Sequence, residues 1–315
     1  MLEFLDRPLQ RKLNKHLTKT KILTKKNKTV HYYALWPGFD PTVDYQFWTQ
    51  FLSQNTEAEN IHVLLPFTKG LHVWKLILHV IVHGRWDYFI TGEHAKDRLY
   101  LAKKSIGFHH PSRLFPNRFR FPYWKWYLNW QEINTEWEHF RFGKAIETSE
   151  LTLSINQRYG QLTEAQFNGA NHRIVILTSH FHRPRRKLIA LCNAVLGCDI
   201  FGRKTQKFDG PKKELLKKYL WCLCPENKPH KGYITEKIPE AFAAGCIPVT
   251  YCDPLTLSED FNSNAVVNLY HKSDAEIVNI LSRLQSDYSF VNNLRDEPLL
   301  TKLESLEALS DFINR

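Results

Sequence analysis

The sequence predicts an α/β protein in which strands and helices alternate in two blocks. Its 315 residues suffice for two domains of ordinary size, and its 43% apolar content suffices for a core in each. The clearest indication is Tyr219–Asp253, which has the pattern of a strand, a loop, a helix and a second strand. The best linker is Asn168-Gly169-Ala170-Asn171. We therefore place the boundary between the blocks near residues 167–172.

The first segment, residues 1–29, is basic and has leucines at helical spacing. We predict a basic amphipathic helix. It either lies on an anionic membrane or packs on the rest of the protein with its charged face in solvent. The N-terminus lacks the pattern of a signal peptide, and no apolar run approaches the ~18–20 residues of a membrane helix. The cations are Arg7, Arg11, Lys12, Lys15, Lys19, Lys21, Lys25, Lys26 and Lys28.

The first block, residues 30–167, opens with alternating strands and helices. A predicted strand, Tyr88–Thr91, ends at Gly92 and presents Glu93 at its carboxyl end. Residues 124–166 are predicted to be helical and irregular. The preceding elements are a strand at 29–35, a helix at 43–54, a strand at 61–66 and an apolar segment at 71–82 that fits either a strand or a helix.

The second block, residues 168–290, begins with a strand at 173–178 and a helix that runs to about residue 196. Arg185, Arg186 and Lys187 at the start of this helix are mildly unfavourable against the helix dipole, so they are either tolerated there or bind an anion. Further elements are a helix at 212–218, a strand at 265–269, a helix at 274–285 and a helix at 299–313 within a C-terminal segment, residues 291–315.

The stretch at 219–253 combines a strand end with a helix start. Pro239 is tolerated only in the first turn of a helix, which places the helix start near Thr235–Lys237. In open α/β sheets ligands bind beyond the carboxyl ends of strands, and a helix N-terminus attracts anions. Lys237 beside Glu236 is therefore either a solvated salt-bridged turn or a phosphate site in which Glu236 accepts hydrogen bonds from sugar hydroxyls.

Composition narrows the classes of partner. The formal net charge of +11 allows nucleic acid, an anionic membrane or an anionic small molecule, but no nucleic-acid-binding motif is present. The six cysteines are not spaced as zinc pairs, and buried free thiols in a reducing cytosol are the favoured interpretation. The 13% aromatic content suits a sugar-binding cleft or ordinary packing equally well.

Two stretches resemble the α1,3/4-fucosyltransferases of glycosyltransferase family 10, in the form of a bacterial member. The first combines Pro225-Glu226-Asn227, Gly232-Tyr233-Ile234-Thr235-Glu236-Lys237-Ile238 and Ala241-Phe242-Ala243-Ala244-Gly245-Cys246-Ile247-Pro248, which resemble the family's donor-binding motif. The second is Trp86–His94 with Ser105–Phe108 and Asn117–Trp124. Pro225, Lys228, His94 and His109 depart from the residues usual in the family.

The resemblance implies two Rossmann-like domains facing across a cleft, the B-type glycosyltransferase architecture. The first would bind the acceptor and the second a nucleotide sugar. The implied activity is inverting transfer of L-fucose from GDP-fucose to a glycan hydroxyl, with an α1,3 linkage and no metal. The cysteines and the basic N-terminal segment, in turn, predict a cytoplasmic protein with peripheral contact at the inner face of the membrane.

The resemblance also assigns roles to individual residues. Glu93 would be the catalytic base, with Asp97 and Asp40 as weaker candidates and His94 beside it. Arg185, Asn227, Tyr233, Glu236 and Lys237 would bind the donor, with Arg186 and Thr235 as secondary candidates.

Two other functions remain open from the sequence. One is a related transferase that uses another nucleotide sugar. The other is a non-catalytic protein that binds nucleotides or glycans.

Overall fold

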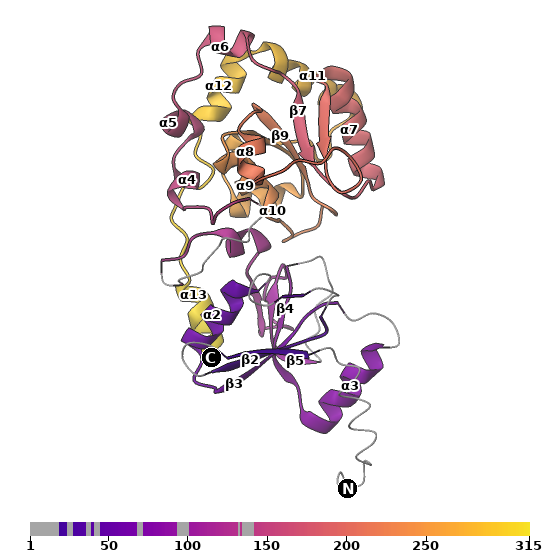
Figure 1. Ribbon diagram of the computed structural model, residues 1–315, viewed down its shortest axis with the longest axis vertical. Helices are drawn as coiled ribbons and strands as arrows, with labels where there is room; N and C mark the ends of the chain where they lie inside the picture. The colour runs from indigo at the N-terminus through magenta and orange to yellow at the C-terminus, as the bar shows by residue number, and fades with distance from the viewer. Residues whose placement is uncertain are drawn as a thin grey trace. The chain divides into compact units, whose positions relative to one another are not determined.

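The computed structural model describes residues 19–23, 28–35, 39–40, 45–67, 72–92, 101–131, 133 and 142–315. The chain divides into two compact units. One comprises Met1–Trp126, Trp130–Thr135 and Ser305–Arg315, and the other comprises Tyr127–Asn129 and Glu136–Glu304. Figure 1 shows both as layered α/β units. The predicted α/β class is therefore confirmed, and each unit is described in turn.

The first unit is built on a six-stranded sheet with the order β1-β2-β3-β4-β5-β6. All neighbouring strands are parallel except β1 and β2. Because the order of these strands follows the chain, no reversal of the kind at which a ligand crevice opens is found among the described residues of this sheet. The strands are β1 (Lys19–Leu23), β2 (Thr29–Tyr33), β3 (Asn60–Leu64), β4 (Trp86–Ile90), β5 (Ala102–Gly107) and β6 (Arg118–Arg120).

Helices and aromatic side chains supply the core of the first unit. Phe47 and Trp48 on α2 pack against Phe121 and Trp126 in stacked and edge-to-face pairs, and Phe51 stacks on Phe47. Packing therefore accounts for this part of the aromatic content. The apolar segment whose type stayed open is a helix, α3. The helices are α2 (Gln46–Asn55), α3 (His72–His83), η1 (Tyr123–Tyr127) and α13 (Glu307–Asn314).

The two ends of the chain differ from the prediction. Residues 19–23 form a strand rather than part of a basic helix, because they pair with the edge of β2 from Lys19↔Tyr33 to Leu23↔Thr29. Residues 1–18 and 24–27 lie outside the described residues. At the other end, α13 returns to the first unit, where Lys104 Nζ donates to the carbonyls of Phe312 (2.9 Å) and Ile313 (2.6 Å).

The second unit has a parallel five-stranded sheet with the order β11-β10-β9-β7-β8. Consecutive strands β7 and β8 extend it one way, and β9, β10 and β11 extend it the other way. The order therefore reverses between β7 and β9, which is the switch point of a doubly wound fold. The strands are β7 (Ile174–Leu177), β8 (Cys198–Phe201), β9 (Trp221–Pro225), β10 (Ile247–Tyr251) and β11 (Val267–Asn268).

The helices of the second unit form two groups around this sheet. Helix α7 lies against α11, while α8 and α9 lie together beside α4 (Figure 1). The helices are α4 (Ser149–Thr152), α5 (Ile155–Tyr159), α6 (Glu164–Asn168), α7 (Arg183–Val195), α8 (Lys212–Leu216), α9 (Lys237–Ala243), α10 (Pro254–Asp260), η2 (Ser263–Ala265), α11 (Asp274–Ser286) and α12 (Tyr288–Asp296).

The division between the units falls earlier than the predicted boundary at residues 167–172. Residues 136–167 belong to the second unit, because their helices bind α8 and α9. Lys213 Nζ lies 2.5 Å from Glu150 Oε1, and Arg158 Nη2 donates to the carbonyl of Phe242 at 2.7 Å. The Asn168–Asn171 linker connects α6 to β7 within one unit.

Two further sequence predictions, on the cysteines and on membrane helices, can be compared with the described residues. All six cysteines are free and buried, as the sequence predicts. Burial raises the pKa of the Cys192, Cys198 and Cys252 thiols to about 12, so these thiols stay protonated at neutral pH. Across the described part of the chain, no helix is long and apolar enough to cross a membrane.

Candidate functional site

The switch point of the second unit collects the predicted donor-binding residues. Thr178 follows β7, Glu226 and Asn227 follow β9, and the helices α7 and α9 begin after the loops that start there. Because carboxyl ends of parallel strands share one sheet edge, these loops meet. The predicted strand–loop–helix–strand pattern at 219–253 is confirmed, with α9 starting at Lys237.

Arg185 joins the two loops across the switch point. Its side chain is buried, with 5% of the residue exposed. Nη1 donates to Thr178 Oγ1 (2.7 Å) and to the carbonyl of His180 (2.9 Å). Nη2 donates to the carbonyl of Pro225 (3.1 Å) and to Asn227 Oδ1 (2.7 Å). Its buried Nε has no hydrogen-bond partner within the described part of the chain. Arg185 thus connects the two loops through four hydrogen bonds, and its Nε–H is a donor that these bonds do not use.

Glu226 is a residue of this site that the sequence analysis did not single out. Its side chain is fully buried at the end of β9. Oε1 accepts from the backbone N–H of Thr235 at 2.8 Å, and both carboxylate oxygens lie 3.0 Å from Thr235 Oγ1. Oε2 also lies 3.0 Å from Lys237 Nζ. Glu226 therefore ties the end of β9 to the first turn of α9.

Lys237 carries the positive charge at the start of α9. Besides Glu226, its ammonium contacts Thr235 Oγ1 at 2.5 Å, and its side chain is 23% exposed. Burial lowers the pKa of Lys237, but the carboxylates of Glu226 and Glu236 outweigh burial and raise the pKa above its usual value. Lys237 is therefore fully protonated at neutral pH and remains partly open to solvent.

The remaining predicted residues occupy different positions around this cluster. Glu236 is the N-cap of α9, and although burial raises the pKa of its carboxyl, Lys237 and Lys212 lower it overall. Tyr233 is only 1% exposed, so its ring lies inside the loop. Asn227 is exposed and is held by Arg185, whereas Arg186 points to solvent on α7. The sequence also allowed a solvated, salt-bridged surface turn at Glu236–Lys237. The burial of Glu226 and Thr235, which contact Lys237, does not fit such a turn.

The predicted catalytic candidates belong to the first block of the sequence. Glu93, His94 and Asp97 lie outside the described residues. Asp40 is exposed in the first unit. Among the residues that the structure describes, no group of three or more His, Cys, Asp or Glu side chains is arranged to hold a metal ion.

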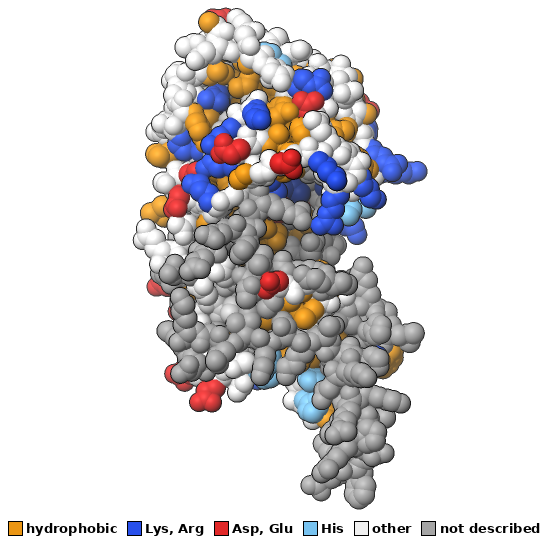
Figure 2. Space-filling view, viewed as in Figure 1, with side chains coloured by type: hydrophobic (Ala, Val, Ile, Leu, Met, Phe, Trp, Pro, Cys, Tyr) orange, Lys and Arg blue, Asp and Glu red, His pale blue; other side chains and the backbone are white. Residues whose placement is uncertain are grey.

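Further cations surround the switch point. They are exposed and lie in the loops after β8 and β9 and in the first turn of α7, and Figure 2 shows Lys and Arg side chains gathered toward one end of α7. Such a concentration of positive charge attracts anions to this edge of the sheet. The residues are Arg183, Arg186, Arg203, Lys204, Lys207, Lys228 and Lys231.

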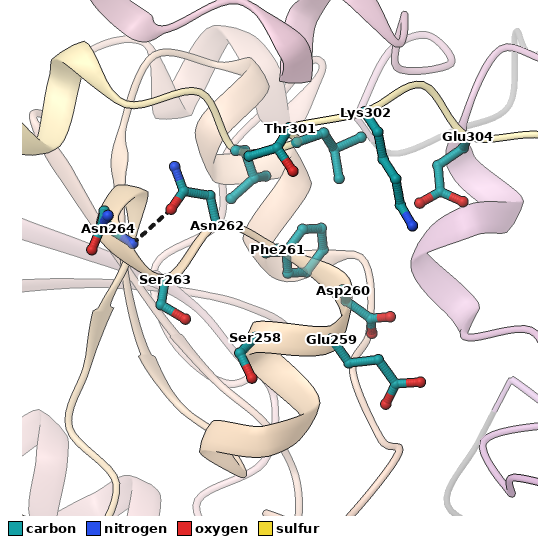
Figure 3. A pocket seen from close by; sticks show the side chains of 12 residues that line it. Ser258, Glu259, Asp260, Phe261, Asn262, Ser263, Asn264, Thr301, Lys302 and Glu304 are labelled. Atoms are coloured by element: carbon teal, nitrogen blue, oxygen red, sulfur yellow. Dashed lines mark hydrogen bonds between the residues drawn. The ribbon is translucent and has the colours of Figure 1, made fainter.

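A separate cavity of about 340 Å³ lies at the end of α10 (Figure 3). Glu259, Asp260 and Glu304 line it together with Lys302, and none of the predicted donor-binding residues does. An excess of carboxylates disfavours a phosphorylated ligand there. The chemistry of the second unit therefore points to the switch point and not to this cavity.

Comparisons with known proteins show which proteins this chain resembles. Residues 169–293 match the family model described as glycosyltransferase family 10 (fucosyltransferase) C-term. The alpha-(1,3)-fucosyltransferase FucT of Helicobacter pylori is 33% identical over 92 residues, which are 29% of this chain. That match spans 19% of the length of the curated relative.

Solved structures resemble the chain more widely. The crystal structure of an alpha1,3-fucosyltransferase superposes with a TM-score of 0.62 at 16% identity, over 86% of this chain and 85% of that one. An alpha1,3-fucosyltransferase with GDP-fucose gives a TM-score of 0.55 at 17% identity, over 80% and 88%. The predicted resemblance is confirmed, and these overlays show that the chain has the fold of these proteins.

Proposed function

We propose that the chain is an inverting glycosyltransferase that moves L-fucose from GDP-fucose to a hydroxyl group of a glycan, forming an α1,3 linkage. The observation that carries this proposal is the cluster at the switch point, where Arg185 and Lys237 flank the buried Glu226 within the part that matches family 10. The relatives with known structure include one with GDP-fucose, which supports the choice of donor.

The donor's charged part suits this cluster. Two cations and the N-terminus of α9 can stabilise a nucleoside diphosphate, both when it binds and when it leaves. Lys237 would contact the diphosphate with its remaining N–H, and Arg185 would offer its Nε–H. Glu236 and Asn227 would accept hydrogen bonds from the ribose, and the buried Tyr233 would support the loop under the donor.

The acceptor would be activated by the first unit. Inversion requires one direct displacement, and thus a general base instead of a covalent enzyme nucleophile. Glu93 is our candidate, with His94 and Asp97 near it in sequence and Asp40 as a further carboxylate. The first unit would then bind the glycan, whereas the second binds the donor.

We expect turnover of GDP-fucose without a metal ion, because side-chain cations and the helix N-terminus neutralise the leaving group. Release of GDP in the presence of a glycan acceptor should persist after chelation with EDTA. Loss of turnover that manganese restores would contradict this mechanism. Turnover of a UDP-sugar instead would favour the related transferase, and GDP binding without turnover of any sugar donor would favour the non-catalytic protein.

We also propose that the protein is cytoplasmic and contacts the inner, anionic face of a membrane. The N-terminal segment carries four cations before β1, namely Arg7, Arg11, Lys12 and Lys15. Helix α3 supplies apolar contacts, since Trp74 and Ile81 are 69% and 63% exposed and lie on one face at i and i+7. A basic segment and an exposed apolar helix face are the two contributions that peripheral binding combines.

Cosedimentation with anionic vesicles separates these contributions. Each Lys or Arg near such a surface contributes about 1 kcal/mol, so deletion of residues 1–18, which removes four of the nine cations of the basic segment, should reduce the salt-sensitive binding. This deletion leaves β1 intact, unlike removal of the whole basic segment. Replacing Trp74 and Ile81 with serine should instead reduce the binding that persists at high salt. Wild-type protein that stays in the supernatant at low salt would rule out membrane contact.

A further inference from the structure

The buried carboxylate at the switch point has more partners than a structural ion pair needs. Glu226 accepts from Thr235 twice, through the backbone N–H and the hydroxyl, and from Lys237 once. All three donors come from the segment that starts α9, nine to eleven residues further along the chain. The carboxylate therefore fixes where α9 begins relative to the end of β9.

The same contacts orient the ammonium group of Lys237. An ammonium has three N–H donors, and two of them point to Glu226 Oε2 and Thr235 Oγ1. The side chain of Lys237 is 23% exposed while that of Glu226 is fully buried, and we assign the remaining donor to a ligand on the exposed side. Without Glu226 the flexible four-carbon stem would have no fixed direction, and ordering it would oppose ligand binding.

Glu226 also lies between two cations. Arg185 donates to the carbonyl of Pro225 and to Asn227, the residues on either side of Glu226 in the chain. Burial lowers the pKa of Arg185, and the negative charge of Glu226 opposes that shift. One buried anion thus allows two cations to approach the same sheet edge before any ligand arrives.

We infer that Glu226 is a positioning residue for the diphosphate of the nucleotide donor, acting through Lys237. The inference rests on the proposed function, since it assumes a nucleoside diphosphate at the switch point. Glu226 does not contact the diphosphate itself, because its carboxylate is buried and would repel the phosphate groups. It holds the cation that does.

A double-mutant cycle with GDP as the probe tests this role. We expect Glu226→Gln to weaken GDP binding by about tenfold or more, as measured by titration calorimetry, because a glutamine cannot hold the ammonium by charge. In a Lys237→Ala background the same change should alter the dissociation constant by less than about twofold, because the residue it acts through is gone. A merely structural role would weaken binding equally in both backgrounds.

Two further variants keep the outcome decisive. Thr235→Val removes the hydroxyl that bridges Glu226 and Lys237, and should weaken GDP binding severalfold even if Glu226→Gln does not fold. Glu150→Gln is the matched control, since it breaks the partly buried pair with Lys213 elsewhere in the same unit and should leave the dissociation constant unchanged. Wild-type affinity in both Glu226→Gln and Thr235→Val, or additivity with Lys237→Ala, would overturn the inference. Wild-type protein that does not bind GDP would instead contradict the proposed function.

Discussion

Lys237→Ala should abolish most of the rise in melting temperature that GDP produces in the wild-type protein. A ligand that binds only the folded state stabilises it by about 2.7 kcal/mol at a hundredfold excess over its dissociation constant. Lys237 supplies the positive charge that is both fixed by buried partners and partly open to solvent. Its removal takes away the charge-assisted contact that we expect to the diphosphate. The exposed cations around the switch point should not replace this contact, because their charges are screened by solvent and salt.

The variant should also be less stable without ligand. Removing Lys237 leaves the carboxylate of Glu226 buried without its cation, and breaking a buried pair in this way costs about 3–5 kcal/mol. The comparison is therefore the shift caused by GDP, measured for each variant against its own ligand-free melting temperature. Adding Glu226→Gln to Lys237→Ala should recover part of the lost stability but none of the GDP shift.

A control variant shows whether the lost GDP shift comes from Lys237 itself or from the lower net charge of the protein. Lys187→Ala removes a cation from α7 in the same unit, where Lys187 pairs with Asp274 and both side chains are exposed. The GDP shift of this variant should equal that of the wild type, since exposed charges are screened by solvent and salt. A GDP shift in Lys237→Ala as large as in the wild type would remove Lys237 from the site.

Much of the second unit could be predicted because its elements carry local signals. The strand at 221–225 is a short apolar run, and Pro239 restricts the helix start to a few residues, so the prediction and the structure agree there. The glycine at 245 ends the helix, and its φ of 94° is one that other residues rarely adopt. Each of these signals lies within a few residues of the strand or helix end that it predicts.

The features that the sequence did not predict depend on distant partners. Glu226 follows an apolar strand and has the sequence context of an exposed loop residue, but Thr235 and Lys237 fold back over it and bury it. A carboxylate directly after a buried strand, followed by Thr and Lys nine and eleven residues later, is the signal that could have found it. The strand at 19–23 likewise forms because β2 offers a free edge.

The predicted boundary between the two blocks differs from the division in the structure for a related reason. Asn168-Gly169 is a local turn signal, and it does mark a connection, from α6 to β7. The sequence cannot show that Arg158 reaches the carbonyls at the end of α9, some 84 residues away, and so binds its helix to the second unit. Tertiary contacts of this kind decide which block a short helix joins.

Glu93→Gln should lower the rate of fucose transfer by a factor of about 10²–10⁴, the usual effect of a positioned general base. The acceptor hydroxyl must lose its proton as it attacks the anomeric carbon. We expect the base in the first unit, since we propose that the cations for the diphosphate come from the second. Glutamine keeps the size and hydrogen bonding of the side chain but does not accept the proton.

The described residues directly before Glu93 end a buried strand. Thr91, at the end of β4, is 1% exposed and donates its N–H to the carbonyl of Ile106 at 3.0 Å. Gly92 follows, and a Cβ there would lie 2.4 Å from the ring of Tyr123, so only glycine allows this close approach. The chain is therefore anchored by a buried strand end directly before the predicted base.

Two measurements on the same variant decide the assignment. Transfer should fall while the affinity for GDP changes by less than about twofold, because a base contributes to the transition state rather than to donor binding. Asp97→Asn and Asp40→Asn are the matched carboxylate controls and should retain most of the activity. Near-normal transfer by Glu93→Gln would refute the role of Glu93, and a large loss in one of the controls would identify the base instead. If GDP binding were lost together with transfer, Glu93 would belong to the donor site or to the fold.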